Sequence, residues 1–242
     1  DGTGGTAAVS NTSRGVFTES SSAYVYVTLG TMGAATDFGD THTTTGASSR
    51  TGCDHATRGI FAGGGGNSPI NDMEYITIAS AGNGTDFGNL SVARSTQSCQ
   101  AMANTTRGVF PGGTVGAGSY SNVMDYVTIG TAGNATDFGN LTAVSSKNPT
   151  ACSIVRGLIF GGIGRTSVID YITIASAGNA ADFGDHLNGD NGERGWAVHN
   201  KLYAYFSRRY TTASEKHTIA TAANATAFNF ASQVDFGEAN TN

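Results

Sequence analysis

Hydrophobic and polar residues alternate in short stretches along this chain, most clearly at 123–129, where the sequence is VMDYVTI. Alternation with a period of two predicts a β-strand, because successive side chains of a strand point to opposite faces. The flanking residues predict the rest of a four-stranded unit: a first strand at 99–103, a turn at 104–106, a second strand at 107–110 that Gly112 and Gly113 end, a hairpin turn at 133–136, and a fourth strand entered through 137–142.

This unit occurs five times. Each copy has an aromatic-led strand, followed twelve residues later by a Phe that we expect in a turn. The pairs are Tyr26 and Phe38, Tyr75 and Phe87, Tyr126 and Phe138, and Tyr171 and Phe183, and His217 with Phe228 keeps the spacing to within one residue. The Phe copies are about 45 to 51 residues apart, a period typical of four-stranded propeller blades rather than of helical or leucine-rich solenoids.

We therefore expect an all-β fold, a five-bladed β-propeller of four-stranded antiparallel blades. A single domain would span 1–242, with blades near 1–46, 47–95, 96–146, 147–191 and 192–242. Strand candidates at both ends, near Thr6–Ser10 and Phe228–Val234, indicate that blade 5 docks on blade 1 and closes the ring. In a closed ring, Phe17, Phe61, Phe110 and Phe160 would be buried between neighbouring blades. Because the chain begins at Asp1, we also expect it to be a processed product or part of a longer protein.

The composition agrees with this fold and disfavours some classes of binding partner. The chain has 35 Gly and 3 Pro, as expected for short strands joined by tight turns. A net charge of −5 without a basic tract argues against nucleic acid or an anionic membrane as the main partner, and no apolar run approaches a membrane span. Cys53, Cys99 and Cys152 form an odd set with no CxxC spacing, so we expect buried free thiols and folding in a reducing compartment.

Candidate chemistry is sparse. The oxygen-rich turn Asn83–Asn89 and its copies could hold calcium, but the spacing is not that of an EF-hand, and Asx turns account for the same residues. No HExxH or GxSxG motif is present, and the histidines occupy different repeat positions: His42, His55, His186, His199 and His217. We interpret them as structural, and we expect no enzyme activity, no metal and no cofactor.

The departures from the repeat are the better functional signal. Loops between the second and third strands vary most in length, and variable loops on a rigid scaffold are common recognition sites. These loops are Thr18–Ala23, Gly65–Asp72 and Thr114–Asn122. Blade 5 also concentrates aromatic and basic residues, which interfaces favour and which stack on sugars. The candidate binding residues are Trp196, Tyr203, Arg208, Arg209 and Tyr210, although they could instead simply fill the core of a divergent blade.

The repeat resembles the kelch repeat of β-propellers. The resemblance rests on hydrophobic stretches that end in a double glycine (61–64, 110–113 and 159–162), followed by a Tyr, an aromatic residue about twelve positions later and, in copy two, Arg94. It covers all five copies, with Phe where kelch repeats usually have Trp and no double glycine in copies one and five. No position matches the copper site of kelch enzymes such as galactose oxidase.

The wording RG(V/I)F-x-GG, together with YITIASAGNGTDFGNL at 75–90, is similar to kelch-like repeats in structural proteins of marine bacteriophages, especially cyanophages. This resemblance implies a non-enzymatic virion component, a tail fibre or appendage that contacts other virion proteins or a host-surface glycan. A homo-oligomer formed through a region outside the chain is compatible with it. The alternative is a secreted, free lectin-like propeller that binds carbohydrate.

Overall fold

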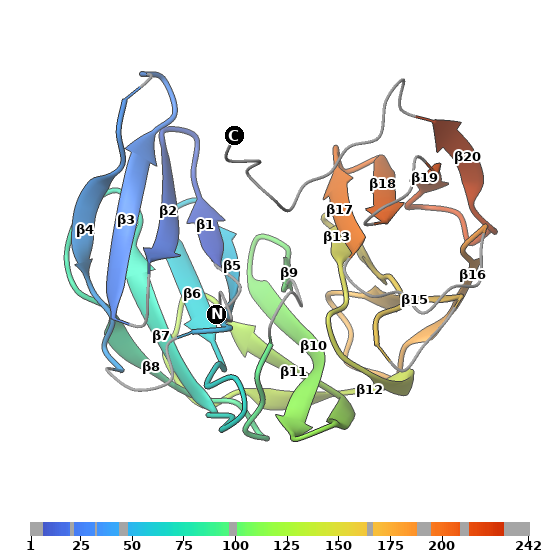
Figure 1. Cartoon of the computed structure of the whole chain (residues 1–242), viewed down its shortest axis with the longest axis horizontal. Helices are drawn as coiled ribbons and strands as arrows, with labels where there is room; N and C mark the ends of the chain where they lie inside the picture. Colours follow the sequence, from blue (N-terminus) through green and yellow to red (C-terminus); the bar gives the residue numbers. More distant parts are fainter. Residues whose placement is uncertain are drawn as a thin grey trace, which may run out of the picture.

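A computed structural model describes residues 7–19, 22–31, 33–43, 48–96, 101–163, 167–187, 195–208 and 213–229. Twenty β-strands in these residues form five four-stranded antiparallel sheets, and each sheet uses four consecutive strands. The sheets stand around a common centre as the blades of a propeller (Figure 1). The predicted fold class, an all-β five-bladed propeller, is confirmed. No helix long and apolar enough to cross a membrane occurs in the described residues.

Each blade is named by its order in the chain. Blade 1 contains β1 (Ala8–Ser10), β2 (Arg14–Glu19), β3 (Ala23–Thr28) and β4 (Thr36–Asp40). Blade 2 contains β5 (Thr51–His55), β6 (Arg58–Ala62), β7 (Asp72–Thr77) and β8 (Thr85–Asn89). Blade 3 contains β9 (Met102–Ala103), β10 (Arg107–Gly116), β11 (Ser119–Thr128) and β12 (Thr136–Ser145). Blade 4 contains β13 (Thr150–Cys152), β14 (Arg156–Ile159), β15 (Val168–Thr173) and β16 (Ala181–Asp185). Blade 5 contains β17 (Gly195–His199), β18 (Tyr203–Arg208), β19 (Ala213–Thr218) and β20 (Thr226–Asn229).

The first strand of each blade is the inner one. Contacts between blades run from β1 to β5, β5 to β9, β9 to β13 and β13 to β17. The fourth strands lie at the rim (Figure 1). Blades 2, 3 and 4 are therefore covered on both faces by neighbouring blades. For this reason, the side chains on each of the two faces of their strands are apolar or half-buried.

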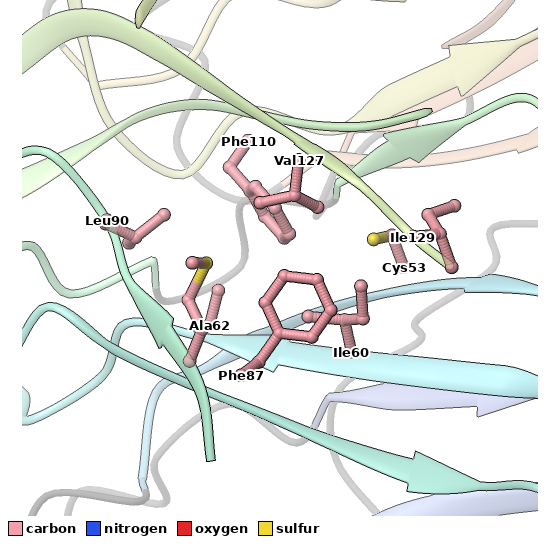
Figure 2. Packing of buried hydrophobic residues seen from close by; sticks show 9 residues of the cluster. Cys53, Ile60, Ala62, Phe87, Leu90, Phe110, Val127 and Ile129 are labelled. Carbon is pink, nitrogen blue, oxygen red and sulfur yellow. The ribbon is translucent and has the colours of Figure 1, made fainter. Parts of the chain in front are cut away.

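Four hydrophobic clusters fill the spaces between successive blades. Between blades 2 and 3, for example, Ile60 and Phe87 pack against Phe110, Val127 and Ile129 (Figure 2). The other clusters join blades 1 and 2, blades 3 and 4, and blades 4 and 5. Among the described residues, no fifth cluster joins blade 5 to blade 1, and 230–234 of the predicted closing strand lie outside those residues. The core is thus divided between the blade interfaces, and four of these are closed.

The Phe that follows each aromatic-led strand is expected in a turn, and this expectation is wrong. Phe38 lies within β4, and the next residue, Gly39, has a positive φ of 144° where the pairing with β3 shifts register. A Cβ on Gly39 would lie only 2.6 Å from the backbone of Gly82 in the next blade. Glycine is needed because this irregular strand packs directly on the neighbouring backbone.

The loop expected at Thr114–Asn122 is also different. β10 continues past Gly112 and Gly113 to Gly116, and β11 begins at Ser119, so blade 3 carries a long hairpin in place of a loop. A bulge at the double glycine and a second between Thr114 and Gly116 let the strand bend and continue. The prediction that the double glycine ends the strand is therefore wrong in this blade.

The oxygen-rich turns serve the packing between blades. Asn83 Oδ1 accepts a hydrogen bond from the backbone N–H of Asp40 in the previous blade, at 3.0 Å. Asn134, Asn179 and Asn224 make the equivalent bond in later blades. Asp86 lies within β8, and its Oδ1 accepts the N–H of Gly88 where the pairing of that strand shifts register. The expected Asx turn at the hairpin is therefore wrong for this Asp, and the Asn links successive blades.

An arginine ties each closed interface. The guanidinium of Arg58 lies over the ring of Tyr75 in its own blade, 4.2 Å from the ring centroid, and its Nη1 donates to the carbonyl oxygen of Ile129 in the next blade, at 2.9 Å. The same arrangement occurs three more times. Its members are Arg14, Tyr26 and Ile78; Arg107, Tyr126 and Ile174; and Arg156, Tyr171 and Ile219. We call this arrangement the arginine tie.

The cysteines that the structure describes are free thiols. Cys53 is buried, Cys152 is half-buried, and Cys99 lies outside the described residues. Cys53 and Cys152 lie on the first strands of blades 2 and 4, where they fill space between blades. The expectation of free thiols is confirmed for these two residues.

Candidate functional site

Blade 1 exposes the face that looks away from blade 2. Phe17 is 38% exposed, whereas Phe61 and Phe110 at its repeat position, and Phe160 in blade 4, are completely buried. The expectation that all four are buried is therefore wrong for Phe17. Leu29 is 57% exposed, although residues at its repeat position in other blades, such as Ile78, are buried. We call this surface the seam face of blade 1; it consists of Gly15, Phe17, Val25, Val27 and Leu29.

Blade 5 exposes the complementary face. Val198 pairs with Tyr205, and it occupies the repeat position of Cys53, which pairs with Ile60. Cys53 is buried in a closed interface, whereas Val198 is 64% exposed. Trp196 on the same strand is 45% exposed. The seam face of blade 5 consists of Trp196, Val198, Tyr203, Tyr205 and Lys216. In Figure 1 the described strands of blades 1 and 5 stand apart at this place, which we call the open seam.

The arginine tie is also replaced at the open seam. Tyr203 stands at the repeat position of Arg58, since Tyr203 pairs with Thr218 as Arg58 pairs with Thr77. Lys216 stands at the position of Tyr75 and lies over the Tyr203 ring, with its Nζ 3.8 Å from the ring centroid. The aromatic and cationic partners have therefore exchanged places. Among the described residues, Lys216 makes no hydrogen bond to blade 1, so blade 5 keeps the local stack without the tie.

The carboxylate that marks the closed interfaces is replaced in blade 1. Glu74, Asp125, Asp170 and Glu215 are buried, and each accepts a backbone N–H from the previous blade. The donor lies just after the fourth strand, except that Thr142, the donor to Asp170, lies within β12. Val25 occupies this position in blade 1. The open seam therefore combines two apolar faces, a Trp and two Tyr side chains, and few groups that need polar partners. Such a surface suits packing against another molecule.

The structure brings together two of the five predicted binding residues. Trp196 and Tyr203 both lie on the seam face of blade 5. Arg208 ends β18, but its side chain lies outside the described parts, and Arg209 and Tyr210 lie outside the described residues altogether. Val198 was not singled out from the sequence. Its alternation with Ala197 along β17 would have placed it on the same face as Trp196.

Two of the five histidines meet across the interface of blades 4 and 5. His186 follows β16, and its Nδ1 lies 2.7 Å from Oε2 of Glu215 on β19. Nε2 of His217, also on β19, lies 3.5 Å from the same oxygen. Burial by itself would raise the pKa of Glu215, but the two imidazoles hold that pKa down at about 2. From the sequence all five are interpreted as structural histidines at different repeat positions, and this pattern gives no sign that His186 and His217 meet.

A shallow pocket opens between blades 2 and 3 on the side of the short turns. It encloses about 300 Å³ and offers several hydroxyl groups next to one guanidinium. Its lining residues are His55, Thr57, Arg58, Thr105, Thr106, Thr128, Ile129 and Gly130. Hydroxyls and a guanidinium in a shallow depression can exchange hydrogen bonds with a polar ligand such as a sugar.

Comparison of the chain with protein-family models and with curated proteins gives no match.

Proposed function

We propose that this propeller is a non-enzymatic binding and structural module of a virus particle, in a tail fibre or appendage. A neighbouring virion protein packs on the open seam. The observation that carries the proposal is the contrast between four closed interfaces and one open pair of apolar faces, in which Phe17 and Val198 are exposed at positions that are otherwise buried.

Three features support this assignment. The seam face of blade 5 carries Trp196, Tyr203 and Tyr205, and aromatic residues dominate the energetics of protein interfaces. The described residues of this seam form no arginine tie, which leaves both faces available to a partner. The sequence motif of the repeat is also similar to that of kelch-like repeats in phage structural proteins, which favours a component of a virus particle over a free enzyme.

The test is a photo-crosslinking amino acid at position 196 in the protein as it occurs on purified particles. We expect a cross-link to a different virion protein, identified by mass spectrometry. The matched control places the same amino acid at Thr51, the equivalent position in closed blade 2, where we expect no intermolecular product. A cross-link from position 196 to blade 1 or to 230–242 of the same chain would mean that the chain itself covers the seam, and the proposed interface would be wrong.

Host recognition is the second part of the test. The isolated domain, an Arg208→Ala/Arg209→Ala variant and a variant with a shortened loop at Gly65–Asp72 are compared for adsorption to host cells. If the domain adsorbs and either change abolishes adsorption, the module is an adhesin. If it adsorbs to nothing while the particle assembles only in its presence, its role is structural.

A carbohydrate-binding, lectin-like propeller is the second candidate, and the pocket between blades 2 and 3 favours it. Its threonines would donate to and accept from sugar hydroxyls. A glycan array separates the two candidates. Binding that is lost in a Thr105→Val/Thr106→Val variant and kept in a Trp196→Ala variant would identify the pocket as the site and assign lectin activity. If only the Trp196→Ala variant loses glycan binding, the binding site lies at the open seam.

A further inference from the structure

The cluster His186, Glu215 and His217 has the composition of a metal site. One ligand atom from each residue lies within 4.8 Å of the other two, and all three residues are buried. The imidazoles approach one carboxylate oxygen from two different blades, at 2.7 and 3.5 Å. The cluster lies outside both the open seam and the pocket between blades 2 and 3.

The other interfaces show what the repeat places here when no such cluster is present. His186 replaces a buried leucine, Leu90 or Leu141, and His217 replaces a buried isoleucine such as Ile172. At the earlier interfaces the carboxylate is served by a hydroxyl, as Asp125 is by Ser91 Oγ at 2.6 Å. Two aliphatic residues of the core are thus replaced by histidines, which lie on either side of one carboxylate. A hydrogen bond to the carboxylate does not require two histidines, because one hydroxyl supplies it at the earlier interfaces.

His217 gives independent support for a ligand at this place. Its side chain is completely buried, and neither Nδ1 nor Nε2 has a hydrogen-bond partner among the described residues. Its ring lies against Phe160 and Phe183, with centroids 5.3 and 6.2 Å away. A buried imidazole with neither nitrogen satisfied is unfavourable. Nε2 is already close to the carboxylate, where a shared cation would satisfy it.

We propose that His186, Glu215 and His217 bind one divalent transition-metal ion, with Zn²⁺ as the best match to two imidazoles and a carboxylate. Imidazole ligands favour zinc and its neighbours over Ca²⁺ and Mg²⁺, which require a set of oxygen ligands. Zinc bonds of about 2.0–2.2 Å place tetrahedral ligand atoms roughly 3.3–3.6 Å apart, so small side-chain shifts suffice. Binding displaces the proton that His186 Nδ1 shares with Glu215.

The aromatic surroundings indicate a structural role for the ion. Phe160 and Phe206 stack across the same interface with centroids 5.1 Å apart, and the His186 ring lies 4.5 Å from that of Phe206. An ion held from β19 and from the segment after β16 would fasten blade 5 to blade 4. Blade 5 has its other face at the open seam, where no described residue of blade 1 packs on it, so the fastening adds to the one interface that the described residues close.

The experiment uses the full chain without a histidine tag, stripped with a chelator and then titrated with Zn²⁺ in a calorimeter and with Co²⁺ in a spectrophotometer. We expect one ion per chain, a rise in melting temperature with Zn²⁺, and Co²⁺ absorption bands of four-coordinate intensity. The matched variant, His186→Leu/His217→Ile, restores the residues of the repeat itself. It should fold and lose at least about tenfold in affinity, a loss that removal of even the outer partners of metal ligands can cause.

Two controls keep the outcome clear. His199→Ala removes an exposed histidine outside the cluster and should leave the titration unchanged. If the double variant does not fold, the Co²⁺ spectrum of the wild type decides, because a four-coordinate site of three protein ligands and one other ligand gives more intense bands than hydrated Co²⁺. Failure of the wild type to bind either ion, or equal binding by a folded double variant, would overturn the proposal.

Discussion

The interface between blades 2 and 3 and the open seam between blades 5 and 1 use the same repeat positions with opposite results. Ile60 and Phe110 face each other in the first and are completely buried. Their counterparts at the seam are Tyr205, which is half-buried, and Phe17, which is exposed. Both surfaces are apolar, so apolar character alone does not distinguish a closed interface from an open one.

The difference lies in the polar links between blades. At the closed interface, Arg58 stacks on Tyr75 and donates to Ile129, and Asp125 accepts hydrogen bonds from Ser91. At the seam, Tyr203 and Val25 occupy the positions of the arginine and the carboxylate. Such links have fixed directions, so they set how two blades are oriented, while the apolar side chains supply most of the free energy.

The largest expected difference is in packing. Phe110→Ala removes a completely buried ring and should lower the free energy of unfolding by about 3–5 kcal/mol. Phe17→Ala removes the equivalent ring at the seam and should lower it by only about 1 kcal/mol. Urea denaturation of both variants measures the difference. Equal losses would mean that Phe17 is buried in solution and that the ring closes.

The arginine tie should show a smaller contrast. Arg107→Ala removes a stack on Tyr126 and a hydrogen bond to Ile174, and should lower the free energy of unfolding by about 1–3 kcal/mol. Lys216→Ala removes only the stack on Tyr203 and should lower it by about 0.5 kcal/mol. The same denaturation assay applies. A larger loss for Lys216→Ala would show that blade 5 has a link that the exchanged pair does not account for.

The blades could be predicted from the sequence because the repeat is a local signal of spacing and alternation. Trp196 and Tyr203 stood out as surface residues because they break the repeat. The exposure of Phe17 could not be predicted, since RGVF in blade 1 is identical to RGVF in blade 3 and burial depends on what lies opposite. The meeting of His186 and His217 was missed for a related reason: residues at different repeat positions come together only when adjacent blades pack face to face.

The only tryptophan of the chain reports directly on the open seam. Trp196 should emit close to the wavelength of tryptophan in water, and acrylamide should quench it in the folded protein almost as well as in urea, because its side chain is exposed. The control is a Trp196→Phe/Phe87→Trp variant, which moves the single tryptophan into the cluster of Figure 2. Blue-shifted, protected emission from Trp196 would show that the seam is covered.

Thiol chemistry provides the comparison with the smallest energetic effect, because it leaves the packing almost unchanged. Cys53 lies in the closed interface between blades 2 and 3, where burial raises the pKa of its thiol and keeps reagents away. A Val198→Cys variant places another thiol at the equivalent, exposed position of the seam. Iodoacetamide should therefore modify the introduced thiol in the native protein and Cys53 only after denaturation, as measured by peptide mass spectrometry. Equal protection of both thiols would show that the seam face of blade 5 is packed as tightly as the closed interfaces. Equal labelling would show instead that the closed interfaces open readily, and that the distinction between the two regions is one of degree.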